Sequence, residues 1–342
     1  MRKPKRWEDV EIDDVTILGP RFGLRSENLA EIQQVTVEGL RELAYCMQIG
    51  GETMAESEIA WLAEWPQPDR VREEVEAYVA TVTEVLTRAI PESSLKGLYY
   101  KGSALKQWES ALDYVPEVSD VDFHVWFASD EDVETYFGSM DFALDVQAGL
   151  EHAYEVRVTD PIHGPRPQFV VLNQLLKDPS YAGPPSHLVL TLVGDDLAEK
   201  PYNTQMMLEN DCERAQSHTD FLAKLPGSAV DKPGRLMWKV LRDLTFRVSP
   251  AGPWAAHFLG APTEVAWESN RTQIYHELIA RGRQDVASAY ADYYTSSWGY
   301  FLSDWKDTAA GRTAIRKGIE VIELTSEIAS RWAAKREGDR SA

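Results

Sequence analysis

Two short apolar runs that meet polar residues constrain this chain more than any other feature. Residues 98–100 lead into the sequence Lys-Gly-Ser at 101–103, and residues 120–127 alternate between polar and apolar side chains. Both runs are typical of strands, and the first ends in a turn. Because residues two apart in a strand share a face, Asp120 and Asp122 are predicted to project together from one side of a sheet.

A pair of carboxylates at this spacing favours a metal site. Two carboxylates a few Å apart repel each other, and burial beside an apolar sheet increases that repulsion. A divalent cation between them removes the repulsion, and magnesium is commonly held by one or two carboxylates together with substrate phosphates. Two such ions can clamp the attacking and leaving oxygens of a displacement at phosphorus. Asp120 and Asp122 are therefore predicted metal ligands and catalytic residues, with Mg²⁺, or Mn²⁺ in its place, as cofactor.

The turn after the first strand supplies groups that suit a phosphate. Gly102 allows close backbone approach at a strand-to-helix turn, and amides at a helix N-terminus can bind a phosphate. The Ser103 hydroxyl adds a donor, and Lys101 or Lys106 adds positive charge. Together with the carboxylates, this turn predicts metal-assisted binding of a nucleotide.

At these residues the chain resembles the polymerase-β-like nucleotidyltransferase superfamily, including its small-substrate and antibiotic-modifying members. The resembling features are a helix, an apolar strand ending in Gly-Ser, and a strand that opens Asp-x-Asp. Residues 168–173 and 188–194 resemble the strands that close that domain, so the match covers roughly residues 70–200. It implies an enzyme that moves a nucleoside monophosphate from a nucleoside triphosphate such as ATP to an acceptor hydroxyl. It also implies that Gly102 and Ser103 hold the β,γ-phosphates.

The chain departs from the family pattern at two places. Residues 104–119 form a longer link than usual between the Gly-Ser and the first aspartate, which implies a long active-site loop carrying Trp108 or Tyr114 to the nucleotide. The family's third carboxylate falls on Gln168, which neither binds magnesium well nor accepts a proton. Glu155, on a predicted strand, is the expected base or third ligand, with Asp160 as the other possibility.

Further residues have two readings each. Lys239 and Arg242 lie one turn apart on a predicted helix; related enzymes often send a cation from the helical domain to the triphosphate, while the other reading is a solvated face. His124 either lines the site or is an ordinary strand histidine. The aromatic-rich segment 290–305 is interpreted as helical core, with an acceptor-binding wall as the alternative.

The periodicity predicts an α+β fold: a nucleotidyltransferase-type mixed sheet with helices, flanked by helical regions. The expected divisions are an N-terminal helical region over 1–66, the core over 67–200 and a C-terminal helical domain over 201–342. The expected helices begin at caps Asn28 and Asp69 or cover residues 130–152, 235–248, 264–280 and 312–332, with Pro-containing breaks at 226–227, 233–234 and 250–253. The remaining expected strands cover residues 154–158, 169–172 and 188–193.

The composition of the chain limits the classes of molecule that it is expected to bind. The formal net charge of -20 opposes a long phosphate backbone, so a long nucleic acid is an unlikely partner and a cationic small-molecule acceptor is favoured. Apolar runs stay short of the roughly 18 residues of a membrane span, and the charged first residues do not resemble a signal peptide. A cytoplasmic protein without membrane contact is expected, with Cys46 and Cys212 as buried free thiols.

Two alternatives to an active small-substrate enzyme stay open at this point. One is a catalytically impaired nucleotide-binding or interaction module that kept the aspartate pair and lost the third acid. The other is a toxin–antitoxin-type nucleotidyltransferase that modifies a protein or a tRNA. The sequence favours the active enzyme because the turn and the aspartate pair occur together.

Overall fold

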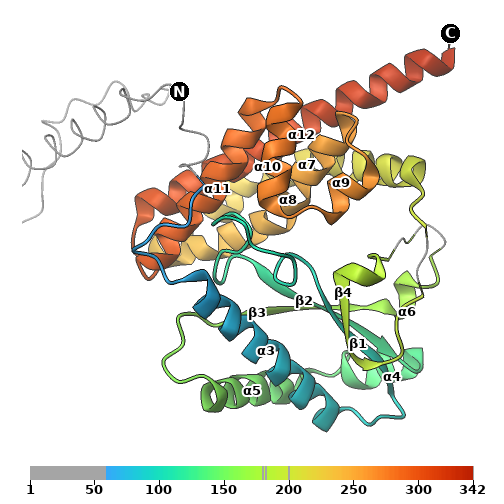
Figure 1. Ribbon diagram of the computed structural model, residues 1–342, viewed down its shortest axis with the longest axis vertical. Coiled ribbons are helices and arrows are strands. Elements are labelled where there is room, and N and C mark those ends of the chain that lie inside the picture. The colour runs from blue at the N-terminus through green and yellow to red at the C-terminus, as the bar shows by residue number, and fades with distance from the viewer. Residues whose placement is uncertain (1–58, 179–180, 182, 199–200, 342) are drawn as a thin grey trace, which may run out of the picture. The chain divides into compact units, whose positions relative to one another are not determined.

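The computed structural model describes residues 59–178, 181, 183–198 and 201–341 (Figure 1). The helix expected from Asn28, most of the expected N-terminal region and Cys46 lie outside these residues. Cys212 is a buried free thiol, as predicted. Among the described residues there is no helix long and apolar enough to cross a membrane.

The centre of the described chain is a mixed four-stranded sheet. The strands are β1 (Leu95–Lys101), β2 (Asp120–Phe127), β3 (Arg166–Val171) and β4 (Val189–Gly194). Their order is β3-β2-β1-β4, with β1 antiparallel to both neighbours and β2 parallel to β3. The α+β prediction is therefore confirmed, and so are four of the five expected strands.

Helices cover one face of this sheet. The side chains that β2 sends there, Val121, Phe123, Val125 and Phe127, are fully buried. They pack with the apolar face of α3 (Pro68–Ala89) and with α5 (Met140–Arg157), which lie side by side in Figure 1. The intervening residues of β2 point to the opposite face, because strand side chains alternate. The short helices α4 (Asp130–Tyr136) and α6 (Leu172–Leu175) complete this part.

The strand expected over residues 154–158 is wrong, because this segment is the last turn of α5. Val146, Leu150 and Tyr154 are buried at a spacing of four, which is the spacing of one helix face. The alternating apolar pattern that suggested a strand includes Val156, whose side chain is 73 % exposed. Over so short a run, a period of two cannot be told from a period near four. The segment is helical because it continues the helix that begins at Met140.

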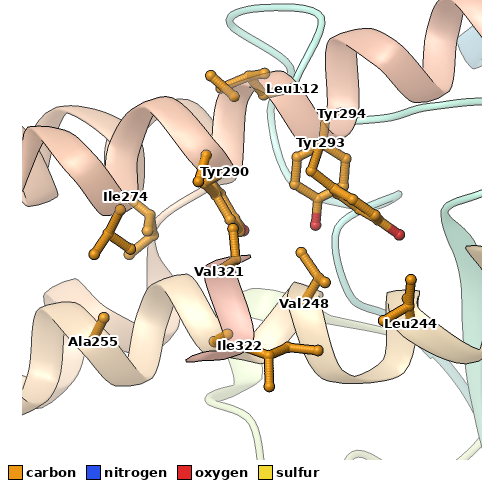
Figure 2. Packing of buried hydrophobic residues seen from close by; sticks show 14 of the residues in the cluster. Leu112, Leu244, Val248, Ala255, Ile274, Tyr290, Tyr293, Tyr294, Val321 and Ile322 are labelled. Atoms are coloured by element: carbon orange, nitrogen blue, oxygen red, sulfur yellow. The ribbon is translucent and has the colours of Figure 1, made fainter. Parts of the chain in front are cut away.

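The C-terminal part is helical, as expected. Its long helices pack around an aromatic centre in which Tyr290, Tyr293 and Tyr294 lie among aliphatic side chains (Figure 2). The core reading of residues 290–305 is thus confirmed. The elements of this part are α7 (Thr204–Ala229), η4 (Gly234–Leu236), α8 (Met237–Phe258), α9 (Thr263–Glu268), α10 (Arg271–Ala280), α11 (Gln284–Leu302) and α12 (Thr308–Ser341), while η3 (Ser186–Leu188) directly precedes β4 in the sheet part.

Several expected helix boundaries are wrong. Pro226 lies inside α7, and Pro250 and Pro253 lie inside α8. A proline removes one helical hydrogen bond, but the burial of Ala251, Trp254 and Ala255 holds α8 continuous through this stretch. The segment 264–280 divides into α9 and α10, whereas α3 begins at Pro68, so that Asp69 lies in its first turn instead of capping it.

Candidate functional site

Asp120 and Asp122 project from the same side of β2, as the alternation predicts. With its amide turned to satisfy both, Gln168 donates hydrogen bonds to Asp122 Oδ1 at 3.1 Å and Asp120 Oδ2 at 3.2 Å. Gln168 reaches them because it pairs with Asp122 in the parallel register of β2 and β3. One polar group thus touches both carboxylates, so their oxygens converge on one point.

The Gly102–Ser103 turn lies against Asp122. Gly102 has a φ of 88°, and a Cβ added to it would lie 1.9 Å from Asp122 Oδ2. Glycine is therefore required both for the left-handed backbone and for the close approach of the carboxylate. The expected helix after this turn is absent: the Leu105 and Lys106 amides donate to Gly102 O, which closes a single turn.

Asp120 carries a second contact on its other oxygen. Arg166 Nη1 lies 2.6 Å from Asp120 Oδ1, in an ion pair without hydrogen-bond alignment. The guanidinium is held by the carbonyls of Glu117 and Val118, which accept from Nε and Nη2 at 3.2 and 2.9 Å. Burial raises the pKa of Asp120 to about 6, with Arg166 acting in the opposite direction and Asp122 adding to the rise. Its charge is therefore costly in this position.

The acids expected to complete the pair do not reach it. Glu155 is exposed on α5, and Asp160 is exposed with its carbonyl accepting from Arg70 Nη2 at 3.1 Å. Neither lines the cleft beside the pair. Among the described residues no group of three or more His, Cys, Asp or Glu side chains could hold a metal. The position across from Asp122 belongs to Gln168.

A cleft of about 550 Å³ opens beside the turn, between the sheet and the helical part. From the sheet side it is lined by Lys101, Gly102, Ser103, Lys106, Asp122 and His124. From the helices it is lined by side chains that include Asn210, Asp211, Arg214, Ser249, Asn270, Arg271 and Tyr290. The cleft therefore has a lining of mixed charge, in which two lysines and two arginines face four aspartates, Asp113, Asp122, Asp178 and Asp211. Such a lining offers groups for a phosphate and for a cation.

Two titratable side chains in the cleft are shifted by burial. Burial, followed by the nearby Lys101, lowers the pKa of His124 to about 3, so this histidine is neutral. His124 thus faces the site but carries no charge there. Burial, together with Arg271 and Lys101, lowers the pKa of Lys106 to about 8. Its Nζ donates to the carbonyls of Trp267 and Ser269, which hold it against the helical wall.

Sequence reasoning missed Arg271, which joins the helical part to the Ser103 turn and to Ser119. This buried residue, the first of α10, donates from Nη1 to Ser119 Oγ at 2.9 Å and from Nη2 to Ser103 Oγ at 3.3 Å. It also donates to two loop carbonyls and lies over the Tyr294 ring at 4.2 Å. The capping box of Asn270 and Gln273 marks the helix start in the sequence, although nothing local indicates its partner.

The cations expected from the helical part differ in placement. Lys239 is exposed on α8 and does not line the cleft. Arg242, one turn later, is half-buried, and its charge acts on Asp120. Its Nε has no hydrogen-bond partner among the described residues. The solvated reading therefore fits Lys239, while Arg242 lies within electrostatic reach of the pair.

The aromatics of the long loop do not reach the cleft. Tyr114 is fully buried, stacks on Trp108 at 4.7 Å, and its hydroxyl lies 3.2 Å from His163 Nε2. Trp108 lies under the Arg72 guanidinium. Neither ring lines the cleft, because Tyr114 lies in the core formed by α3 and the sheet and the half-buried Trp108 packs against that core.

The assembled site places groups suited to a cation beside groups suited to an anion. Its two converging carboxylates suit a divalent cation, and the adjacent turn and basic side chains suit a phosphate chain. These properties follow from the residues themselves. Comparisons of the chain with protein-family models, with curated proteins and with solved structures found no match.

Proposed function

We propose that this chain is a metal-dependent nucleotidyltransferase that moves a nucleoside monophosphate from a nucleoside triphosphate to an acceptor hydroxyl. One observation carries the proposal: Asp120 and Asp122 converge on one side of β2, and Asp122 lies directly against the Gly102–Ser103 turn at the wall of a cleft. The resemblance of these residues to the polymerase-β-like superfamily supplies the reaction class.

The residues fit a divalent cation. Gly102 leaves Asp122 Oδ2 the space that a side chain would fill, and Asp120 Oδ2 faces the same point as Asp122 Oδ1. Asp120 and Asp122 would hold Mg²⁺ or Mn²⁺, which supplies neutralising charge to the reacting phosphate. No third carboxylate lies beside them among the described residues, so the side chains that would hold the cation carry two negative charges.

The remaining side chains bind and orient the triphosphate in this proposal. The Ser103 hydroxyl and its turn face the cleft beside Lys101 and Lys106. Arg271 holds Ser103 from the helical side and brings a permanent charge close to the phosphates. Arg242 adds positive potential near Asp120, where negative charge develops on a departing pyrophosphate.

We further propose that the acceptor is a small molecule. A cleft of about 550 Å³ accommodates a nucleotide or a compact ligand, and its helical wall includes the buried carboxylate Asp211. The net charge of -20 favours a cationic acceptor over a polynucleotide. A cytoplasmic location, with access to nucleoside triphosphates and Mg²⁺, belongs to the same proposal.

A second function is favoured by one specific observation. Both aspartates already contact Gln168, Asp120 also pairs with Arg166, and Gln168 cannot act as a base. A chain of this kind could bind a nucleotide without transferring it. Calorimetry and pyrophosphate release separate the two functions, because only the enzyme gives turnover.

The test uses the full chain, each nucleoside triphosphate and a panel of hydroxyl acceptors, with and without Mg²⁺. The enzyme proposal expects Mg²⁺-dependent binding that Asp122→Asn weakens at least about tenfold, and pyrophosphate release with at least one acceptor. Asp145→Asn, an exposed site on α5, is the matched control. Binding without release supports the module, whereas binding that ignores both Mg²⁺ and Asp122→Asn refutes the site.

A further inference from the structure

The Gln168 side chain occupies the point on which the two aspartates converge. Its amide end lies 3.1 Å from Asp122 Oδ1 and 3.2 Å from Asp120 Oδ2. The half-buried Gln168 is held there by its strand, because its backbone pairs with Asp122 in the β2–β3 ladder. A glutamine amide has two faces, one with two N–H donors and one with a carbonyl acceptor. Which face it turns to the carboxylates decides what the site can bind.

With its NH₂ group toward the aspartates, Gln168 bridges the two carboxylates as a cation would. Each N–H donates to one carboxylate, so a neutral group joins two negative ones. Arg166 neutralises Asp120 from the other oxygen, at 2.6 Å. The pair therefore has polar partners without any metal, and the repulsion between its members is partly offset.

With the amide rotated by half a turn, Oε1 occupies the same point. Oε1 then lies 3.1 Å from Asp122 Oδ1 and 3.2 Å from Asp120 Oδ2, so three oxygens are gathered there. In an octahedral shell with Mg–O distances of about 2.1 Å, neighbouring ligand oxygens are about 3 Å apart. The distances from Gln168 Oε1 to Asp122 Oδ1 and to Asp120 Oδ2 therefore match the spacing of neighbouring ligands in such a shell, and amide carbonyls are accepted ligands of hard cations.

We propose that Gln168 is a reversible stand-in for the metal and its third ligand: its NH₂ joins the aspartates in the metal-free chain, and its carbonyl binds the cation after an amide flip. The inference rests on the cation site of the proposed function. It assigns to a neutral side chain the position that a carboxylate would otherwise take. The resulting site has two negative charges and binds cations more weakly than a three-carboxylate site of the same shape.

Two substitutions separate these roles. Gln168→Glu keeps the length of the side chain and adds a charge, so Mn²⁺ should bind at least about tenfold more tightly. The same variant loses the N–H donors, so its melting temperature without metal should fall and its rise on adding Mn²⁺ should increase. Gln168→Leu lacks both faces of the amide, and its Mn²⁺ affinity should drop at least about tenfold.

The experiment measures Mn²⁺ binding to the full chain by calorimetry and by the loss of the free-ion signal in electron paramagnetic resonance, with thermal unfolding in parallel. Gln216→Glu and Gln216→Leu, at an exposed position of α7, serve as matched controls. If Gln168→Leu binds Mn²⁺ as tightly as the unaltered chain, or more tightly, Gln168 is no ligand and the inference is wrong. If that variant does not fold, the same-length Gln168→Glu decides, and unchanged affinity there overturns the inference.

Failure of this inference is distinguishable from failure of the proposed function. If Asp120→Asn and Asp122→Asn abolish Mn²⁺ binding while the Gln168 variants leave it unchanged, the cation site stands and only the role of Gln168 falls. If the unaltered chain binds no Mn²⁺ at millimolar concentration, the cation site and the inference built on it fall together.

Discussion

Replacing Asp120 with asparagine should stabilise the metal-free chain. Asp120 is 9 % exposed, and burial raises its pKa from 3.8 to about 6 even though Arg166 acts against the rise. The folded chain therefore binds the Asp120 proton more tightly than the unfolded chain does. Asparagine has nearly the shape of aspartic acid and, like the protonated acid, carries no charge. Asp120→Asn therefore removes the cost of ionising this buried group.

The pH dependence fixes the sign and the size of the effect. A carboxyl group with a raised folded pKa costs stability as pH rises from 3.8 to about 6, and the full cost is present above that window. At about 1.4 kcal/mol for each pKa unit, the cost is about 3 kcal/mol at pH 8 and about half of that at pH 5. Asp120→Asn should gain up to these amounts, because the shifted pKa already includes the attraction of Arg166 for the charged carboxylate.

Urea unfolding at pH 5 and pH 8 in the presence of a chelator measures the difference. The exposed Asp145→Asn, on α5, controls for the general loss of one negative charge. Adding Mg²⁺ should reduce the advantage of Asp120→Asn, because only the aspartate binds the cation. If Asp120→Asn is less stable than the unaltered chain at pH 8, the ion pair with Arg166 outweighs the burial cost and the reasoning is wrong.

Three further outcomes are expected. Gly102→Ala should lower the free energy of unfolding by about 1–3 kcal/mol and abolish Mg²⁺-dependent nucleotide binding, because its Cβ would lie 1.9 Å from Asp122 Oδ2; unaltered affinity in calorimetry would contradict this. Arg271→Met removes the donor of four hydrogen bonds in a buried setting and should cost more than about 3 kcal/mol in urea unfolding, and a loss below 1 kcal/mol, on the order of one ordinary hydrogen bond, would count against it. Glu155→Gln should leave pyrophosphate release within about twofold, since this exposed acid lies outside the cleft; a loss of about tenfold would restore Glu155 as a base.

Local pattern was enough to predict the sheet and the convergence of its acids. In β2 a strict period of two places Val121 and Phe123 in the core and sends the two aspartates to the other side, which needs no knowledge of the rest of the chain. The same local reading failed at residues 154–158, where a few alternating apolar residues also fit a helix. It failed at Pro250 and Pro253 because packing against neighbouring helices outweighed the local preference.

The partners of the site were less predictable than its centre. Arg166 meets Asp120 only because β2 and β3 are parallel and in a particular register. Arg271 meets Ser119 across 152 residues of sequence. No periodicity carries such information, since it depends on how helices of the C-terminal part are placed against the loop. The absence of Glu155 from the pair likewise depends on residues 154–157 being the last turn of α5 instead of a strand.

The loop between β1 and β2 has a consequence for engineering. Its buried residues Ala111, Leu112 and Val115 belong to the hydrophobic core of the C-terminal helices, and the Trp298 indole donates to Ala111 O. Asp113 in the same loop accepts from both the backbone and the hydroxyl of Thr272. A gene fragment that stops before α7 would leave these groups in water without partners. The sheet part therefore cannot be transferred to another protein by itself. A chimaera that replaces the helices must provide apolar contacts and hydrogen-bond partners for this loop.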